Sequence, residues 1–196
     1  MAETPEELYR RAQEAAGPDG RLAMPSVQEW ETFPFEGDIR VRALQPPVDE
    51  EQPRHGEGGV GCRRCERGDE TALWRDANWR VVPVEGKHGL PVIVILETRQ
   101  HFDLPDLPEA LDAELGPLIV RVERAVRGVG EIGRVHVCRW GDGGAHFHVW
   151  FMARPTRLPQ VKGTFAAIWD DILPPTPENV RRANLDAVAR ALAESD

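Results

Sequence analysis

The chain has 196 residues, of which 41% are hydrophobic and 29% charged, so it can bury the core of one domain with extensions. Its formal net charge of −9 argues against a general nucleic-acid binder, because phosphate contacts need a basic face. The longest apolar run, residues 91–96, is too short to cross a bilayer, and the acidic start has no signal-peptide pattern. We therefore expect a soluble cytoplasmic protein that binds neither nucleic acid nor a membrane.

Residues 1–60 are predicted to form an N-terminal extension. Thr4-Pro-Glu-Glu7 has the form of a capping box and predicts a short helix that ends near Ala16. Residues 38–44 alternate with period two, which predicts a strand. Residues 45–61 are rich in Pro, Glu and Gly, which predicts a linker to the next domain.

Residues 61–155 carry the strongest periodic patterns and are predicted to form the main domain. Two strands, 72–74 and 79–84, flank a turn, and the β-branched run 91–96 predicts a buried central strand. Apolar residues at helical spacing predict a helix over 108–129, with Gly116-Pro117 as a kink. Residues 133–139 and 145–153 then alternate as two further strands, with a glycine turn between them.

Residues 156–196 are predicted to be a tail whose helix, 177–193, packs on the same domain. The chain thus lacks the regular alternation of strand and helix that parallel sheets need. We expect an α+β fold, with an antiparallel sheet of about five strands and one long helix packed on it. The N-terminal extension and the C-terminal helix are additions to that layout.

Four residues have the chemistry and spacing of a tetrahedral metal site. Two thiolates held two residues apart can bind one side of a zinc ion, and two imidazoles can complete it. The candidates are Cys62, Cys65, His101 and His146. A redox pair or ordinary thiols are the alternatives for the cysteines, but the strand and helix that frame a thioredoxin-type motif are not visible here.

The segment His146-Phe-His148 follows directly on Gly143-Gly144. Residues two apart in a strand face the same side, so His146, His148 and Trp150 are predicted to project together. Glycine lets backbone N–H groups approach a phosphate, and a neutral imidazole can attack phosphorus. In the alternative interpretations both histidines ligate one metal, or one of them is buried and hydrogen-bonded.

Residues 61–155 resemble the histidine-triad superfamily. The resemblance is carried by the Cys-x-x-Cys, the histidine after the central strand, the helix and the sequence His146-Phe-His148-Val-Trp150. The resemblance implies a nucleotide hydrolase or nucleotidyltransferase in which the middle histidine, His148, attacks the α-phosphate of a nucleotide or similar phosphate compound. It also implies a homodimer. In the zinc-bearing branch the first triad histidine is a ligand, which implies a structural zinc on Cys62, Cys65, His101 and His146.

The third triad position departs from the family pattern, because Trp150 cannot relay a proton as histidine would. We expect Trp150 to bind the substrate by packing against a base or sugar, and the alternative is that it fills the pocket. The polar residues that usually contact phosphate are replaced by a short loop, and we expect Arg139, Gly143 and Gly144 to bind phosphate instead. A solvated Arg139 is the alternative. A catalytically silent module that binds a nucleotide or a partner is the second hypothesis, and a zinc module whose linker docks a protein is the third.

Overall fold

A computed structural model describes residues 5–30 and 33–194, and the chain divides into two units, Met1–Gln52 and Pro53–Asp196. In the first unit, α1 (Pro5–Ala15) matches the predicted helix, whereas its predicted cap, Thr4, lies outside the described residues. A 3-10 turn, η1, covers Ser26–Glu29. The strand expected over 38–44 is wrong: this stretch pairs with no other strand of the described chain, so its alternation lacks the ladder that makes a strand.

The second unit is built on a five-stranded antiparallel sheet, which confirms the predicted fold class. The strands are β1 (Trp74–Arg75), β2 (Trp79–Pro83), β3 (Ile93–Thr98), β4 (Ile132–Cys138) and β5 (His148–Pro155). Their order is β1-β2-β3-β5-β4, so β3 and β5 are central neighbours. All six residues of β3 are buried, as expected of the apolar run that leads into it.

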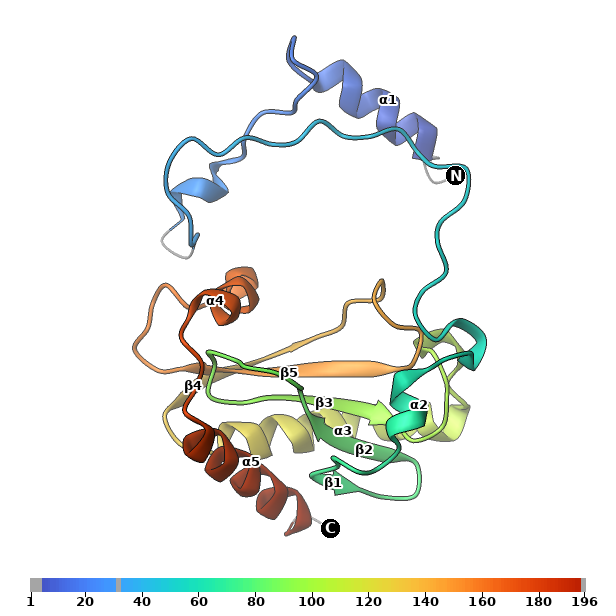
Figure 1. Ribbon diagram of the computed structural model, residues 1–196, viewed down its shortest axis with the longest axis vertical. Helices are drawn as coiled ribbons and strands as arrows, with labels where there is room; N and C mark the ends of the chain where they lie inside the picture. Colours follow the sequence, from blue (N-terminus) through green and yellow to red (C-terminus); the bar gives the residue numbers. More distant parts are fainter. Residues whose placement is uncertain (1–4, 31–32, 195–196) are drawn as a thin grey trace. The chain divides into compact units, whose positions relative to one another are not determined.

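Helices cover both faces of this sheet. They are α2 (Arg63–Arg67), α3 (Glu109–Arg127), α4 (Ala166–Ile172) and α5 (Glu178–Ala193), with 3-10 turns η2 (Glu57–Gly59), η3 (Leu104–Asp106) and η4 (Gly163–Phe165). Helices α3 and α5 lie side by side on one face, and α4 lies over the other (Figure 1). No helix in the described ranges is long and apolar enough to cross a membrane.

The main core lies between the sheet and the helix pair α3 and α5. Alternate residues of β5 and its lead-in, Phe147, Val149 and Phe151, point into it, as the period-two pattern predicts. Trp79 packs edge-on against Phe147 and donates its indole N–H to Glu114 of α3 at 2.6 Å. Each fully buried side chain of this size contributes about 1.5–3 kcal/mol to folding.

Helix α3 continues through Pro117, where the sequence predicted a kink. Proline removes the hydrogen bond to the carbonyl of Ala113. Both residues lie on the exposed side of the helix, so water can satisfy that carbonyl and the helix need not end there.

Helix α4, which the sequence analysis missed, packs onto the turn before β3. Asp170 is buried and accepts a hydrogen bond from the Leu90 N–H at 2.8 Å, and its other oxygen lies 2.9 Å from Nδ1 of His88. A Cβ on Gly89 would lie 2.4 Å from the Cβ of Leu173, so only glycine allows this approach.

Candidate active site and metal centre

The four predicted metal ligands come together in the structure. The ligand atoms of Cys62, Cys65, His101 and His146 all lie within 4.8 Å of one another. Cys62 is the N-cap of α2, and Cys65 lies within that helix. His101 follows β3, and His146 comes two residues before β5, so three separate segments meet at this point.

The spacing of the cluster fits a tetrahedral ion. Nδ1 of His146 lies 3.5 Å from Sγ of Cys62 and 3.4 Å from Sγ of Cys65, and Nδ1 of His101 lies 3.6 Å from Sγ of Cys65. Zinc bonds of about 2.3 Å to sulfur and about 2.0–2.1 Å to nitrogen would set tetrahedral S···N edges of about 3.6 Å. The residues present therefore fit a Cys2His2 metal centre, and all four positions would be filled by the protein.

Hydrogen bonding holds His146 in the form that a metal requires. Its Nε2 lies 2.8 Å from the carbonyl oxygen of Thr98, so Nε2 carries the proton and donates it there. Nδ1 is then left with its lone pair toward the two thiols. Burial lowers the pKa of His146 to about 4, so the ring is neutral at pH 7.

Without a cation the Cys65 thiol would stay protonated at pH 7. Burial first, and then the neighbouring Cys62, raise the pKa of Cys65 to about 11. A bound divalent ion reverses this preference, because it stabilises the thiolate directly. The chemistry of the four donors therefore favours metal binding over a reactive thiol pair.

His148 lies at the start of β5 beside the metal centre and is 5% exposed. Its Nδ1 donates to the carbonyl oxygen of His146 at 2.8 Å, which leaves the lone pair on Nε2. Burial lowers the pKa of His148, the hydrogen bond to His146 opposes this, and Arg64 and Arg139 add to the lowering. A neutral imidazole with a free Nε2 is the form that can act as a nucleophile.

A cleft of about 560 Å³ opens in front of His148. Gly143, Gly144 and Trp150 line it together with His146 and His148, as the sequence predicts. His146 lies outside the regular strand, which begins at His148, yet both histidines face the same cleft. The indole of Trp150 packs edge-on to His148, with ring centroids 6.4 Å apart, so it forms the wall next to the imidazole.

Arg139, predicted to bind phosphate, is not among the residues that line the cleft. Its guanidinium forms an ion pair with Asp103 at 2.5 Å, and Asp103 also holds Arg54 at 2.7 Å. Asp103 is the N-cap of the 3-10 turn η3. It lies 36 positions before Arg139, so no local sequence pattern indicates this ion pair. The structure thus engages Arg139 in an internal ion pair, and phosphate binding by Arg139 stays a prediction.

The arginines that do line the cleft come from α2. Arg63, Arg64 and Arg67 all line the cleft, although the sequence analysis had not singled them out. The sequence Cys-Arg-Arg-Cys-Glu-Arg could have indicated this cluster of arginines. A short helix that begins after Cys62 places their side chains around the candidate metal ligands.

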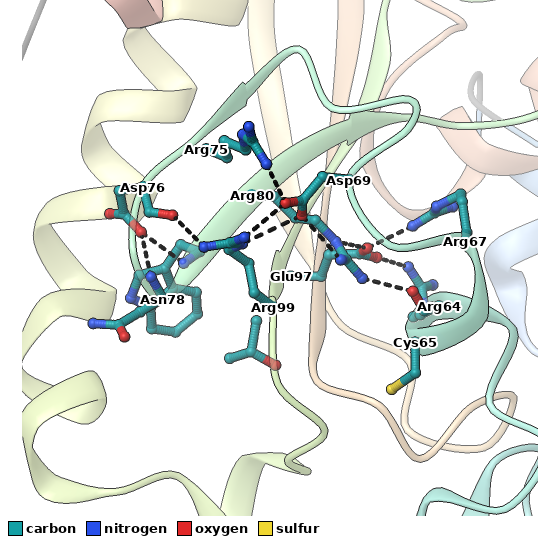
Figure 2. A network of polar contacts seen from close by, with 12 residues as sticks. Arg64, Cys65, Arg67, Asp69, Arg75, Asp76, Asn78, Arg80, Glu97 and Arg99 are labelled. Atoms are coloured by element: carbon teal, nitrogen blue, oxygen red, sulfur yellow. Dashed lines mark hydrogen bonds and ion pairs between the residues drawn. The ribbon is translucent and has the colours of Figure 1, made fainter.

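A network of ion pairs fixes two of these arginines, Arg64 and Arg67, to the sheet (Figure 2). Glu97 of β3 is completely buried and pairs with Arg64 and Arg67 of α2 and with Arg80 of β2. Arg80 also donates to the carbonyl of Arg64 at 2.7 Å, which joins α2 directly to the sheet. Burial disfavours the Glu97 carboxylate, but the three arginines outweigh this and hold its pKa below the usual value.

The predicted linker ends earlier than expected, because residues from Pro53 onward belong to the second unit. The carbonyl of His55 accepts a hydrogen bond from the Ala145 N–H at 3.0 Å, and His55 also lines the cleft. Arg54 adds an ion pair to Asp103 and a hydrogen bond to the carbonyl of Gly141 at 3.1 Å. This segment therefore fixes the glycine loop that precedes the histidines.

No protein-family model and no curated protein matches the sequence, but solved structures do match the chain's fold. One is a hypothetical histidine triad nucleotide-binding protein from Sulfolobus tokodaii, with a TM-score of 0.51 and 12% identity over 68% of this chain and 93% of that chain. Another, a histidine triad protein from Marinobacter aquaeolei, has a TM-score of 0.50 and 18% identity over 66% and 94%. A histidine triad protein from Sinorhizobium meliloti has a TM-score of 0.50 and 15% identity over 64% and 93%.

The chain has the histidine-triad fold. The cleft with His148 lies on the face of the sheet opposite the long helix α3. The resemblance drawn from the sequence is thus confirmed at the level of the fold, including the antiparallel sheet and its packed helix.

Proposed function

We propose that the protein is a histidine-triad enzyme that acts at a phosphate, as a nucleotide hydrolase or a nucleotidyltransferase, through a covalent intermediate on His148. One observation carries the proposal. The Nδ1–H of His148 is held by the His146 carbonyl at 2.8 Å, which leaves the Nε2 lone pair for the cleft that the ring lines. Such a fixed tautomer is what a histidine nucleophile needs.

The reaction would proceed by two displacements at phosphorus. Nε2 of His148 attacks, the new P–N bond forms, and the bond from phosphorus to the leaving group breaks with its electron pair going to that group. Water or a second acceptor then attacks the same phosphorus, the P–N bond breaks, and Nε2 recovers its lone pair. In the hydrolytic case water supplies the proton that the leaving group needs and the hydroxyl that the phosphate gains.

The backbone of Gly143 and Gly144 is proposed to hold the non-bridging oxygens of the reacting phosphate. Both glycines line the cleft, and a Cβ on Gly143 would meet no atom within 4 Å, which leaves room for a ligand. The proposed ligand is a nucleotide or another small phosphate compound. A homodimer, which the family resemblance implies, is kept as a proposal that sedimentation of the full chain would test.

We propose zinc as the ion for the Cys62, Cys65, His101 and His146 centre. Two thiols and two imidazoles at tetrahedral spacing are ligands that zinc prefers. With four protein ligands the ion has no open position for water, so its role would be structural. It would anchor α2 and the segment before β5 on either side of His148.

The test uses dinucleoside polyphosphates, nucleoside phosphoramidates and sugar nucleotides as substrates. The wild-type chain should form products and a nucleotidyl adduct detectable by intact mass. His148→Ala should lose the adduct and at least about a thousandfold in turnover. His136→Ala, on β4 and outside the cleft lining, is the matched control and should retain both. The absence of turnover on all three substrate classes would contradict the proposal.

A binding protein without turnover is the second candidate, and Trp150 favours it. Its indole lies on the cleft wall where a third histidine would stand, and indole does not exchange its N–H proton as imidazole does. Calorimetry would distinguish the two candidates, because saturable nucleotide binding with no product formed is expected only of the silent module.

A further inference from the structure

Helix α2 concentrates positive charge on one wall of the cleft. Arg63, Arg64 and Arg67 take three of its five positions, and all of them line the cleft that holds His148. The chain as a whole is acidic, with a net charge of −9, so this gathering of arginines contrasts with its composition. Cys62 and Cys65 fix the helix at both ends of its first turn, beside the histidines.

The neighbouring carboxylates neutralise these arginines only in part. Glu97 is the one buried acid of the described network, and it faces three guanidinium groups, those of Arg64, Arg67 and Arg80. Glu85, the one acid in the cleft lining, is 80% exposed and lies 3.8 Å from Arg67. Arg63 is exposed and has no ion pair with any residue in the described ranges.

The arginines also retain unused hydrogen-bond donors. A guanidinium carries five N–H groups, and Arg64 and Arg67 each donate one close hydrogen bond to Glu97. Because Glu97 and the Arg80 contact to α2 hold two of the three guanidinium groups in place, the ligand meets pre-ordered donors. A planar guanidinium matches two oxygens of a phosphate at once.

We propose that Arg63, Arg64 and Arg67 form a second anion subsite, which binds a phosphate adjacent to the one that His148 attacks. The inference that the site selects substrates with a diphosphate linkage rests on the proposed function. The preferred leaving group would then itself carry a phosphate, whose charge the three guanidinium groups stabilise as the bond to phosphorus breaks.

Calorimetry with inorganic pyrophosphate and inorganic phosphate tests the subsite on the full chain. Pyrophosphate should bind at least about tenfold more tightly than phosphate. Arg63→Ala should weaken pyrophosphate binding roughly tenfold, which is typical for one charge-assisted hydrogen-bond partner, and Arg63→Glu should weaken it further. Arg182→Ala on α5, an arginine 73% exposed and remote from the cleft lining, is the control and should bind like the wild type.

Equal affinity for pyrophosphate and phosphate would overturn the subsite. An equal loss of pyrophosphate affinity in Arg63→Ala and Arg182→Ala would do the same. The binding measurement is independent of catalysis, so the two proposals fail separately. Pyrophosphate binding through Arg63 in a protein without turnover would support the subsite and remove the enzymatic proposal. Turnover through His148 with wild-type pyrophosphate affinity in Arg63→Ala would remove the subsite alone.

Discussion

Glu97 on β3 is the cross-strand partner of His148 on β5, so a completely buried carboxylate lies one strand from the proposed nucleophile. Arg80 on β2 is in turn the cross-strand partner of Glu97. These three side chains form a row across the sheet, and the row continues into α2 through the ion pairs of Glu97 with Arg64 and Arg67. The glutamate therefore supports both helix α2, which carries two of the candidate metal ligands, and the cleft wall.

Glu97→Gln should destabilise the fold by about 3–5 kcal/mol, because it leaves several partly buried arginines without their common carboxylate. Urea unfolding followed by circular dichroism measures the change. Glu178→Gln, which removes an exposed pair with Arg181, should cost no more than about 0.5 kcal/mol. Equal stability of the two variants would contradict the role given to Glu97.

Acid should weaken the fold through Asp69. Hydrogen bonds from Arg99 first, and from Arg75 and Arg80, outweigh burial and hold the pKa of Asp69 well below its usual value. A lowered folded pKa contributes stability above about pH 4, where the unfolded carboxyl ionises, and that stability is lost as the pH falls toward the folded pKa.

Asp69→Asn is the variant that isolates this effect. It should be less stable than the wild type by on the order of 2 kcal/mol at pH 7, with the difference narrowing below about pH 4. Urea unfolding at pH 7, 5, 4 and 3 measures it. An exposed acid on α5, Asp186, offers the control, since Asp186→Asn should stay within about 0.5 kcal/mol of the wild type throughout. A difference that is constant with pH would argue against this assignment.

Metal analysis should find about one zinc per chain, and chelation should lower the unfolding temperature, because ligation contributes folding free energy. His101→Ala should reduce the zinc content and the unfolding temperature together. Cys138→Ser is the control: this half-buried cysteine of β4 lies outside the four-residue cluster and should leave the zinc content unchanged. Less than one zinc per two wild-type chains would count against the ligand set.

Trp150→His should raise turnover on substrates with poor leaving groups, by roughly tenfold or more, because imidazole can give the leaving group a proton. Trp150 lines the cleft next to His148, so a histidine there would reach the reacting phosphate. Steady-state rates on an alkyl phosphoramidate and on a substrate with an acidic leaving group measure the effect. A gain of the same size on both, or none on either, would be at odds with a missing proton donor.

The sequence predicts the sheet well because its patterns are local, and it predicts the candidate metal cluster because His101 and His146 lie close to the ends of predicted strands. Residues 92–96 of the apolar run are buried because they have no polar side chain to expose. In β5 and its lead-in, Phe147, Val149 and Phe151 face the core and alternate with residues that line the cleft. The strand expected over 38–44 failed because alternation does not supply a partner strand. Helix α2 has only five residues, too few for a periodic pattern, so the sequence alone does not show which way its arginine side chains face.

Pairing between distant segments explains the remaining differences. Arg139 was expected at the phosphate, and Asp103, 36 positions away, forms an ion pair with it. Glu97 follows an apolar run of four residues in β3, and only the fold reveals that three arginines surround it. Helix α4 is short, and its position depends on Asp170 reaching the turn at Leu90. None of these pairs leaves a pattern within a short stretch of sequence.

The hydrogen bond between the His55 carbonyl and the Ala145 amide has a practical consequence for shortening this chain. The stretch from Pro53 to Gly61 reads as a spacer, yet it forms part of the cleft wall and holds the loop ahead of the histidines. A fragment beginning at Gly61 would keep every metal ligand and still lose that support. The working boundary for truncation or fusion therefore falls before Pro53.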